Sequence, residues 1–326
     1  MSSVTVALCT FNGARYLGAQ LDSLVRQTRL PDEVVVRDDG STDGTQEIIS
    51  AWSSRVPFPV TVSHNSHRLG IPGNFWAALG DARGEIIALC DQDDVWHPER
   101  LERSTEVLDD DVTIGGTFTN GWCIDAAGCR SGPKLWDVAG FTTAERARFS
   151  AGHELSVLVD HPVVTGTTLT FRRELRESFF PWPMIPHDYW ISVAIATQRR
   201  LVMIDEPLVQ YRLHDANTIG FPHHHHSFFS YRLAKGRDPM RLAGELAMEA
   251  ALLGGMIELC GRVGCTRVTS EQRRYAAGKL ELIDFRRRLP RQRLRRAPAV
   301  VGRAWRGDYS QFANGRSSWI YDLVRP

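Results

Sequence analysis

The chain has 326 residues, of which 43% are apolar and 24% charged, and its net charge is +1. These ordinary fractions exclude disordered and fibrous proteins, and the length suffices for one large domain or two smaller ones. The small net charge hides an uneven distribution, because residues 285–307 contain nine Arg and no acid. A slightly acidic body therefore carries a basic C-terminal segment.

The cysteines and the apolar runs favour a cytoplasmic location. The six Cys form no Cys-x-x-Cys pair, and Cys9 and Cys90 fall inside strand-like apolar runs. This pattern is more typical of a reducing compartment than of a disulfide framework. We expect no secretory signal before Val4. We also expect no transmembrane helix, since the longest apolar stretch, 242–260, is interrupted by three Glu.

Strand-like and helical patterns alternate over the first hundred residues. The predicted strands are 4–9, 33–37, 60–63 and 85–90, and the predicted helices are 14–27, 45–52 and 72–82. This order predicts a parallel sheet flanked by helices, in which ligands bind beyond the carboxyl ends of the strands.

The pattern is looser beyond residue 100. Strands are predicted at 112–124, 163–172, 201–204 and 208–213, with a loop-rich insertion between the first two, a helix near His187, and helices from 227 with breaks at Gly264 and Pro290. We therefore expect a catalytic domain at 1–222, made of halves 1–110 and 111–222, and a helical, Arg-rich region at 223–326. The run His223–His226 is interpreted as an exposed polar loop rather than a metal site.

An acidic run, Asp91-Gln92-Asp93-Asp94, directly follows a buried strand. Neighbouring carboxylates repel one another unless a cation compensates. Their oxygens suit Mg²⁺ or Mn²⁺ held jointly with substrate phosphates. The alternative is an acidic helix N-terminus ahead of Pro98. The position at the end of a strand favours the metal.

Two further polar clusters follow strands, at Arg37–Gly44 and Thr10–Gly13. Helix capping explains Ser41 to Asp43, but not Asp38 and Asp39 before the turn. Thr10–Gly13 alone would be an ordinary turn. No Gly-x-Gly-x-x-Gly or P-loop pattern follows any strand, so metal and side chains must bind the phosphates.

These clusters together resemble glycosyltransferase family 2, whose members have the A-type nucleotide-sugar-binding fold. The order and spacing agree over Val6–Gly13, Val34–Thr45, Asn65, Leu69-Gly70, Asn74 and Ala88–Pro98. The resemblance covers about the first 110 residues and continues more weakly to about residue 220. It implies a mixed central sheet flanked by helices, with a helical C-terminal extension.

The resemblance also assigns the donor site. It implies that Thr10 and Asp39 contact the base with Asp38 close by, and that Asp91 and Asp93 serve the ribose and a metal-bound diphosphate. Many relatives carry a basic residue in the turn before Asn74, and the resemblance implies that Arg68 takes its role here. The implied donor-binding residues are Thr10, Phe11, Asn12, Asp38, Asp39, Arg68, Asn74, Asp91 and Gln92, and Asp93 with His214 would hold Mn²⁺ or Mg²⁺.

The segment His187-Asp188-Tyr189-Trp190 resembles the family's acidic motif at the start of an acceptor-facing helix. Inverting transfer needs one base for the acceptor hydroxyl, and the resemblance makes Asp188 that base. The alternative is an ordinary N-terminal helix acid with Trp190 in the core. Residues predicted to contact the acceptor are Asp94, His187 and Trp190.

The segment Tyr211-Arg212-Leu213-His214 resembles rhamnosyltransferase-like bacterial members. It favours dTDP-rhamnose as the donor, with UDP-sugars next. A structural role for His214 stays open beside the metal-binding one.

The basic segment Arg286–Arg306 alternates with apolar residues, which suits an anionic membrane surface. A solvated basic helix is the alternative, and no motif for nucleic acid binding accompanies it. Membrane binding would place the chain at the inner face of the bacterial plasma membrane, with a glycan or polyprenyl-diphosphate-linked acceptor.

The sequence thus predicts an inverting, metal-dependent glycosyltransferase of cell-surface polysaccharide synthesis. A sugar nucleotidyltransferase is one rival, although Thr10–Gly13 has no basic residue. A non-catalytic nucleotide-sugar-binding protein is the other.

Overall fold

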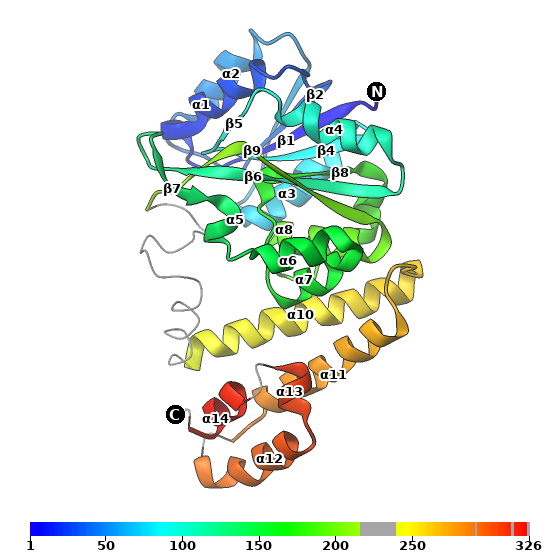
Figure 1. The fold of residues 1–326 in the computed structure, drawn as a ribbon. Coiled ribbons are helices and arrows are strands. Elements are labelled where there is room, and N and C mark those ends of the chain that lie inside the picture. Colours follow the sequence, from blue (N-terminus) through cyan, green and yellow to red (C-terminus); the bar gives the residue numbers. More distant parts are fainter. Residues whose placement is uncertain (216–238, 291, 314–315, 325–326) are drawn as a thin grey trace. The chain divides into compact units, whose positions relative to one another are not determined.

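A computed structural model describes residues 1–215, 239–290, 292–313 and 316–324 of the protein. The chain divides into two compact units, Met1–Phe180 with Pro186–His224, and Pro181–Ile185 with His225–Pro326 (Figure 1). The predicted boundary near residue 222 and the run His223–His226 lie outside the described residues, so both stay predictions.

The first unit is built on a mixed sheet, as predicted. Its strand order is β3-β2-β1-β4-β8-β6-β9-β5, and β7 pairs with β6. The strands β1, β2, β3 and β4 are parallel neighbours, whereas β8 runs antiparallel to both β4 and β6. The strands are β1 (Val4–Thr10), β2 (Glu33–Asp38), β3 (Val60–His64), β4 (Ile86–Asp91), β5 (Val95–Trp96), β6 (Ile114–Ile124), β7 (Arg130–Lys134), β8 (Leu169–Arg172) and β9 (Arg200–Arg212).

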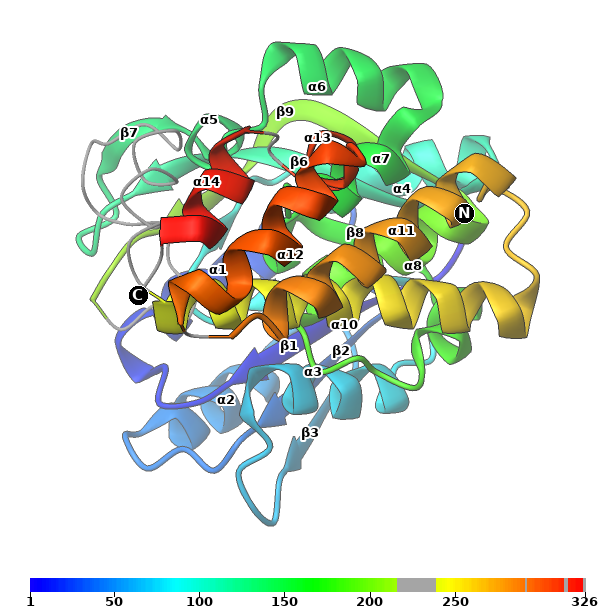
Figure 2. The ribbon, with the colours of Figure 1, turned by 90° about the horizontal axis from the view of Figure 1, so that it is seen from below.

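Helices cover both faces of this sheet, which is why every residue of β1 is buried. On one face lie α1 (Ala14–Val25), α2 (Thr45–Ser53) and α4 (Arg100–Asp110), whose Leu17, Ile49 and Leu101 pack with Val6 and Leu8 of β1. On the other face lie α3 (Gly70–Asp81) and α8 (His187–Gln198), and Figure 2 shows α3 lying across β1 and β2. The parallel strands therefore present only their ends to a ligand.

Several predicted boundaries differ from the structure. The two strands expected at 201–204 and 208–213 are one strand, β9, which continues past Pro207 through shifts of register against β6. The strand expected at 163–172 begins only at Leu169, because Gly166–Thr168 form a tight 3-10 turn. The expected helix at 72–82 begins two residues earlier, since Asp39 accepts the Leu69 and Gly70 N–H groups.

The insertion between β6 and β8 is not loop-rich, and this prediction is wrong. It contains the helices α5 (Leu135–Val138), α6 (Thr143–Arg148) and α7 (Glu154–Asp160). Their formation is explained by an aromatic cluster on β6, in which Trp136, Phe141 and Phe149 surround Phe118 with ring centroids 5.3–6.2 Å away.

The second unit is helical, as predicted. Its helices are α10 (Pro239–Val263), α11 (Ser270–Arg287), α12 (Arg293–Trp305), α13 (Asp308–Phe312) and α14 (Arg316–Val324). The expected breaks at Gly264 and Pro290 fall between them. Leu282, Val300 and Tyr309 form a small core, beside which Asp322 binds Arg286 at 2.7 Å. Among the described helices, none is long and apolar enough to cross a membrane.

Candidate functional site

The carboxyl ends of β1, β2 and β4 bring the three predicted clusters to one edge of the sheet. Thr10 pairs with Asp38 across β1 and β2, and Cys9 pairs with Asp91 across β1 and β4. Burial raises the pKa of the Cys9 thiol, and the nearby carboxylates of Asp91 and Asp39 raise it further. These acids, which come from separate loops, therefore lie around one point.

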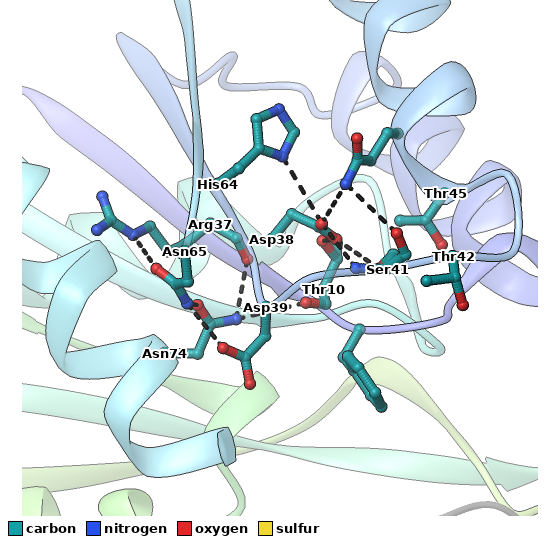
Figure 3. A network of polar contacts seen from close by, with 12 residues as sticks. Thr10, Arg37, Asp38, Asp39, Ser41, Thr42, Thr45, His64, Asn65 and Asn74 are labelled. Carbon is teal, nitrogen blue, oxygen red and sulfur yellow. Dashed lines mark hydrogen bonds and ion pairs between the residues drawn. The ribbon is translucent and has the colours of Figure 1, made fainter. Parts of the chain in front are cut away.

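Asp38 is a fully buried support of this edge. Its Oδ2 accepts the Thr10 hydroxyl at 2.8 Å, and its Oδ1 accepts the Ser41 N–H and the Gln46 amide at 3.0 Å each (Figure 3). Burial alone would raise the pKa of Asp38, but these hydrogen bonds outweigh it and lower the pKa. The Asp38 side chain therefore holds the turn that carries Asp39, and its predicted contact with the donor stays a prediction.

Asp39 and Asn74 hold the loop that leads into α3. Asp39 Oδ1 accepts the Asn65 amide at 2.8 Å (Figure 3). Oδ1 also accepts the Leu69 N–H at 2.7 Å, and Oδ2 accepts the Gly70 N–H at 2.8 Å. Asn74 donates to the Arg37 carbonyl at 2.9 Å and accepts from Asn65. Asn74 thus holds this loop, and its predicted contact with the donor stays a prediction. Oδ2 of Asp39 retains a lone pair for a ligand.

Phe11 and Arg68 form the outer wall of the same edge. The Arg68 guanidinium lies 3.9 Å from the centroid of the Phe11 ring. The Phe11 backbone is held by Gln92, which accepts its N–H at 2.9 Å and donates to its carbonyl at 3.0 Å. Asn12 accepts the Thr42 N–H at 2.9 Å. Gln92 and Asn12 therefore fix the loops around Phe11, and their predicted contact with the donor stays a prediction.

The side chains of the acidic run that follows β4 have different surroundings. Asp91 is partly exposed, and burial, followed by repulsion from Asp93 and Asp188, raises its pKa to about 8. Asp94 is 1% exposed, and its Oδ1 accepts the Arg212 N–H at 2.9 Å. Asp94 thus ties this loop to β9, and its predicted contact with the acceptor stays a prediction.

Asp93 and His214 form a pair of possible metal ligands. His214 Nε2 lies 2.9 Å from Asp93 Oδ2, and the imidazole packs 4.6 Å from the Tyr16 ring. Within the described part of the chain, no group of three His, Cys, Asp or Glu side chains is placed to hold a metal ion. One carboxylate and one imidazole nevertheless fit a divalent cation that takes its other ligands from substrate phosphates. A cation there would also offset the repulsion that Asp91 experiences.

Asp188 enters the same region from the start of α8. Its Oδ2 accepts the Gly166 N–H at 3.1 Å, and its Oδ1 accepts the Tyr189 N–H at 2.8 Å. Because Asp188 acts on the pKa of Asp91, the two carboxylates lie close together. The carboxylate is partly exposed and oriented by two backbone donors, as a base for an incoming hydroxyl requires.

His187, which precedes Asp188, is 4% exposed and stacks on Phe75 with ring centroids 4.0 Å apart. Neither ring nitrogen has a hydrogen-bond partner among the described residues. Burial lowers its pKa, although Asp188 opposes this effect. A β-carbon on Gly166 would lie 3.0 Å from His187 Nε2 and 3.5 Å from Asp91 Oδ2. His187 Nε2 therefore lies near Asp91.

This arrangement can be compared with known proteins. A family model described as Glycosyl transferase family 2 matches residues 5–179, more than half of the chain. The chain belongs to glycosyltransferase family 2. The match includes the Thr10, Asp39 and Asp91 loops but not Asp188, which lies beyond its end.

Curated relatives of this family 2 member align with about two thirds of the chain. A glycosyltransferase of Nostoc sp. with no characterised activity is 29% identical over 224 residues, which cover 66% of this chain and 66% of that protein. The dTDP-rhamnosyl transferase RfbG of Shigella flexneri is 25% identical and covers 65% and 73%. An uncharacterised Mycobacterium tuberculosis protein is 27% identical, and the match spans 59% of it. The chain thus spans just under two thirds of the Nostoc relative and less of the mycobacterial one.

Solved structures share the fold. S. aureus TarS in complex with UDP-GlcNAc superposes with a TM-score of 0.53 and 18% identity, covering 98% of this chain and 91% of that chain. The predicted A-type glycosyltransferase fold is therefore confirmed.

Trp190 of this family 2 member, which was predicted to contact the acceptor, lies in the core. Trp190 is fully buried and its indole N–H donates to the Phe179 carbonyl at 2.6 Å. The alternative weighed from the sequence, a core tryptophan, is what the structure has. The helix must bury this face because it packs against the sheet.

Sequence reasoning missed Arg100 and Gly166. Arg100 is fully buried, lies 3.7 Å above the Trp96 ring, and donates to the Thr167 carbonyl at 2.7 Å. It thereby holds the turn whose Gly166 N–H binds Asp188. The run of small residues Thr165-Gly166-Thr167-Thr168 was the available signal, since such a run allows close approach to acidic side chains.

Proposed function

We propose that this family 2 member transfers a sugar, with inversion, from a nucleotide-diphosphate donor to a hydroxyl of a glycan or lipid-linked acceptor. The observation that carries the proposal is the approach of Asp188 to Asp91, with Asp188 held by the Gly166 N–H at 3.1 Å. A carboxylate at the start of α8 thus lies near one at the end of β4.

In this proposal Asp188 is the base. It takes the proton of the acceptor hydroxyl while that oxygen bonds to the anomeric carbon, and the bond from that carbon to the diphosphate oxygen breaks. The electron pair leaves with the diphosphate, so attack from the opposite side inverts the anomeric centre. The N–H groups of Gly166 and Tyr189 orient the Asp188 carboxylate. The base therefore loses little further conformational entropy when the transition state forms.

Asp93 and His214 would hold a divalent cation, Mn²⁺ or Mg²⁺, together with the donor's phosphates. When bound, such a cation supplies positive charge at the departing diphosphate. Asp91 would accept a hydrogen bond from the donor ribose.

The donor base would lie against Phe11 under Arg68, with the free lone pair of Asp39 Oδ2 accepting a ring N–H of the base. Thr10 would line this wall, although it is only 2% exposed. At the other end of the site, the unpartnered imidazole of His187 would bind a hydroxyl of the sugar acceptor.

For the donor we propose dTDP-rhamnose. The Tyr211–His214 segment supports it, and the relative RfbG of Shigella flexneri is a dTDP-rhamnosyl transferase. For the acceptor we propose a polyprenyl-diphosphate-linked glycan at the inner face of the bacterial plasma membrane, as in cell-surface polysaccharide synthesis.

The test is incubation of the full chain with Mn²⁺, a panel of nucleotide sugars and a lipid-linked glycan. We expect release of nucleoside diphosphate, fastest with dTDP-rhamnose, and a product whose anomeric configuration is opposite to that of the donor. A product with the same anomeric configuration as the donor would overturn the inverting mechanism. Faster release of nucleoside diphosphate from a UDP-sugar than from dTDP-rhamnose would overturn the proposed donor.

The same experiment separates the rival functions. A nucleotidyltransferase would consume or produce pyrophosphate, and a non-catalytic binder would give thermal stabilisation by the nucleotide sugar without any product. Either outcome would replace the proposed transfer.

A further inference from the structure

Helix α12 of the second unit has an apolar stripe on its outer face. Leu294, Pro298, Val301 and Trp305 occupy positions i, i+4, i+7 and i+11, which at 3.6 residues per turn fall within about 60° of one another. Leu294 is 91% exposed and Trp305 89%, whereas Val300, on another face, is fully buried in the unit's core. The stripe is therefore left over after the core has formed.

Basic side chains flank this stripe on both sides. Arg293 and Arg295 lie about 100° to either side of Leu294, and Arg306 follows Trp305. All three are exposed, and none makes an ion pair or side-chain hydrogen bond within the described part of the chain. They carry uncompensated positive charge beside exposed apolar surface.

Two other arginines of the segment face inward instead. Arg286 binds Asp322 at 2.7 Å, and Arg296, 1% exposed, donates to the Leu323 carbonyl at 3.2 Å. These two arginines are thus unavailable to a surface. Among the described residues of Arg286–Arg306, α12 and its flanks present exposed basic side chains beside exposed apolar ones.

We propose that α12 docks on an anionic lipid surface, with Leu294, Val301 and Trp305 among the acyl chains and the flanking arginines against lipid phosphates. The indole of Trp305 belongs to the apolar stripe and has cationic neighbours. Such a side chain suits the boundary between lipid headgroups and acyl chains. A second copy fits the face less well, because isologous pairing would bring the arginine flanks of two chains together. The absence of acids from residues 285–307 removes the repulsion that an anionic surface would otherwise meet.

This inference deepens the proposed membrane location, and its test uses no sugar, so either proposal can fail without the other. The full chain is sedimented with vesicles of equal parts phosphatidylglycerol and phosphatidylcholine, and with vesicles of phosphatidylcholine alone. We expect binding to the mixed vesicles, weakened at about 1 M NaCl, where the screening length falls to about 3 Å.

The double variant Leu294→Ser/Trp305→Ser should lower the vesicle partition coefficient by about tenfold or more. Arg293→Gln/Arg295→Gln should lower it on anionic vesicles only. The matched controls are Val112→Ser, an apolar residue 69% exposed in the first unit, and Arg274→Gln, an exposed arginine on α11. Because the substituted side chains are exposed, we expect all variants to keep the wild-type melting temperature.

Two outcomes would overturn the inference. In the first, wild type and the Leu294→Ser/Trp305→Ser variant sediment equally with the mixed vesicles. In the second, the wild type is a dimer by light scattering without lipid and this variant is a monomer, which would show that a second copy covers the stripe.

Discussion

His214 and Asp93 lie 121 positions apart in the chain, and their Nε2 and Oδ2 atoms are 2.9 Å apart. His214 follows β9, and Asp93 follows β4. Their contact therefore joins the ends of these two strands. Any cation bound there would link the two halves of the unit through β9 and β4.

If Asp93 and His214 hold the cation, Asp93→Asn and His214→Ala should each lower the Mn²⁺-dependent transfer rate by about 100-fold or more. The measurement is the initial rate against Mn²⁺ concentration after chelator treatment. Asp110→Asn, an exposed acid at the end of α4, is the control. A chelated protein with its full rate would contradict the metal site.

Asp188→Asn should lower the transfer rate by about 10²- to 10⁴-fold, because an amide cannot take the acceptor proton. The amide oxygen can still accept the Gly166 N–H, so the turn should hold. Donor affinity, measured by the thermal shift with the nucleotide sugar, should be unchanged. A variant that loses donor affinity instead would make Asp188 a donor ligand and not the base.

The pH dependence of the free energy of unfolding should reveal the titration of His187. Burial lowers its pKa in the folded state below the ordinary value of 6.5, so below pH 6.5 the unfolded chain takes up a proton that the folded chain resists. Stability should therefore fall as the pH falls through this window, by at most about 1.4 kcal/mol per pH unit.

Urea unfolding of wild type and His187→Phe across this window tests the prediction. The phenyl ring keeps the stack on Phe75 but cannot titrate, so the variant should lose less stability on acidification. Parallel curves for the two proteins would show that His187 does not contribute.

Gly166→Ala should lower the transfer rate by about 10- to 100-fold, because the new methyl group lies 3.0 Å from His187 Nε2 and displaces it near Asp188. Gly80→Ala in α3 is the control, since its methyl group would meet no atom within 4 Å. The comparison is of rates at saturating donor. Equal rates for both variants would refute the close packing around Gly166.

Arg100→Met should destabilise the first unit by about 3 kcal/mol or more, because it leaves the Thr167 carbonyl without a donor and removes a buried cation near Asp94. Arg103→Met, on the same helix, removes a surface pair with Glu206 and should cost less than about 1 kcal/mol. Urea unfolding gives both values, and similar losses would contradict the role of Arg100.

Much of the fold of residues 1–110 could be predicted from the sequence, because the patterns that specify it lie within short stretches of the chain. Alternating apolar runs that end in Thr10, Asp39 and Asp91 mark the carboxyl ends of parallel strands, and such ends must share one edge of a sheet. The acceptor half could not be predicted as well. Its helices at 135–160 depend on aromatic packing against Phe118, a contact between distant segments that no short pattern carries.

By itself, the sequence determined the sheet and the residue types available at its edge, since these follow from periodicity and spacing. The family followed from the resemblance of the motifs at that edge to those of family 2. Only the tertiary structure decided what each side chain does there. The polar side-chain atoms of Asp38, Gln92 and Asn74 form hydrogen bonds with neighbouring loops. Asp188 and His187 instead lie near Asp91. The physical reason is that hydrogen bonds within a buried cluster join residues from different strands, and a linear pattern cannot say which donors meet which acceptors.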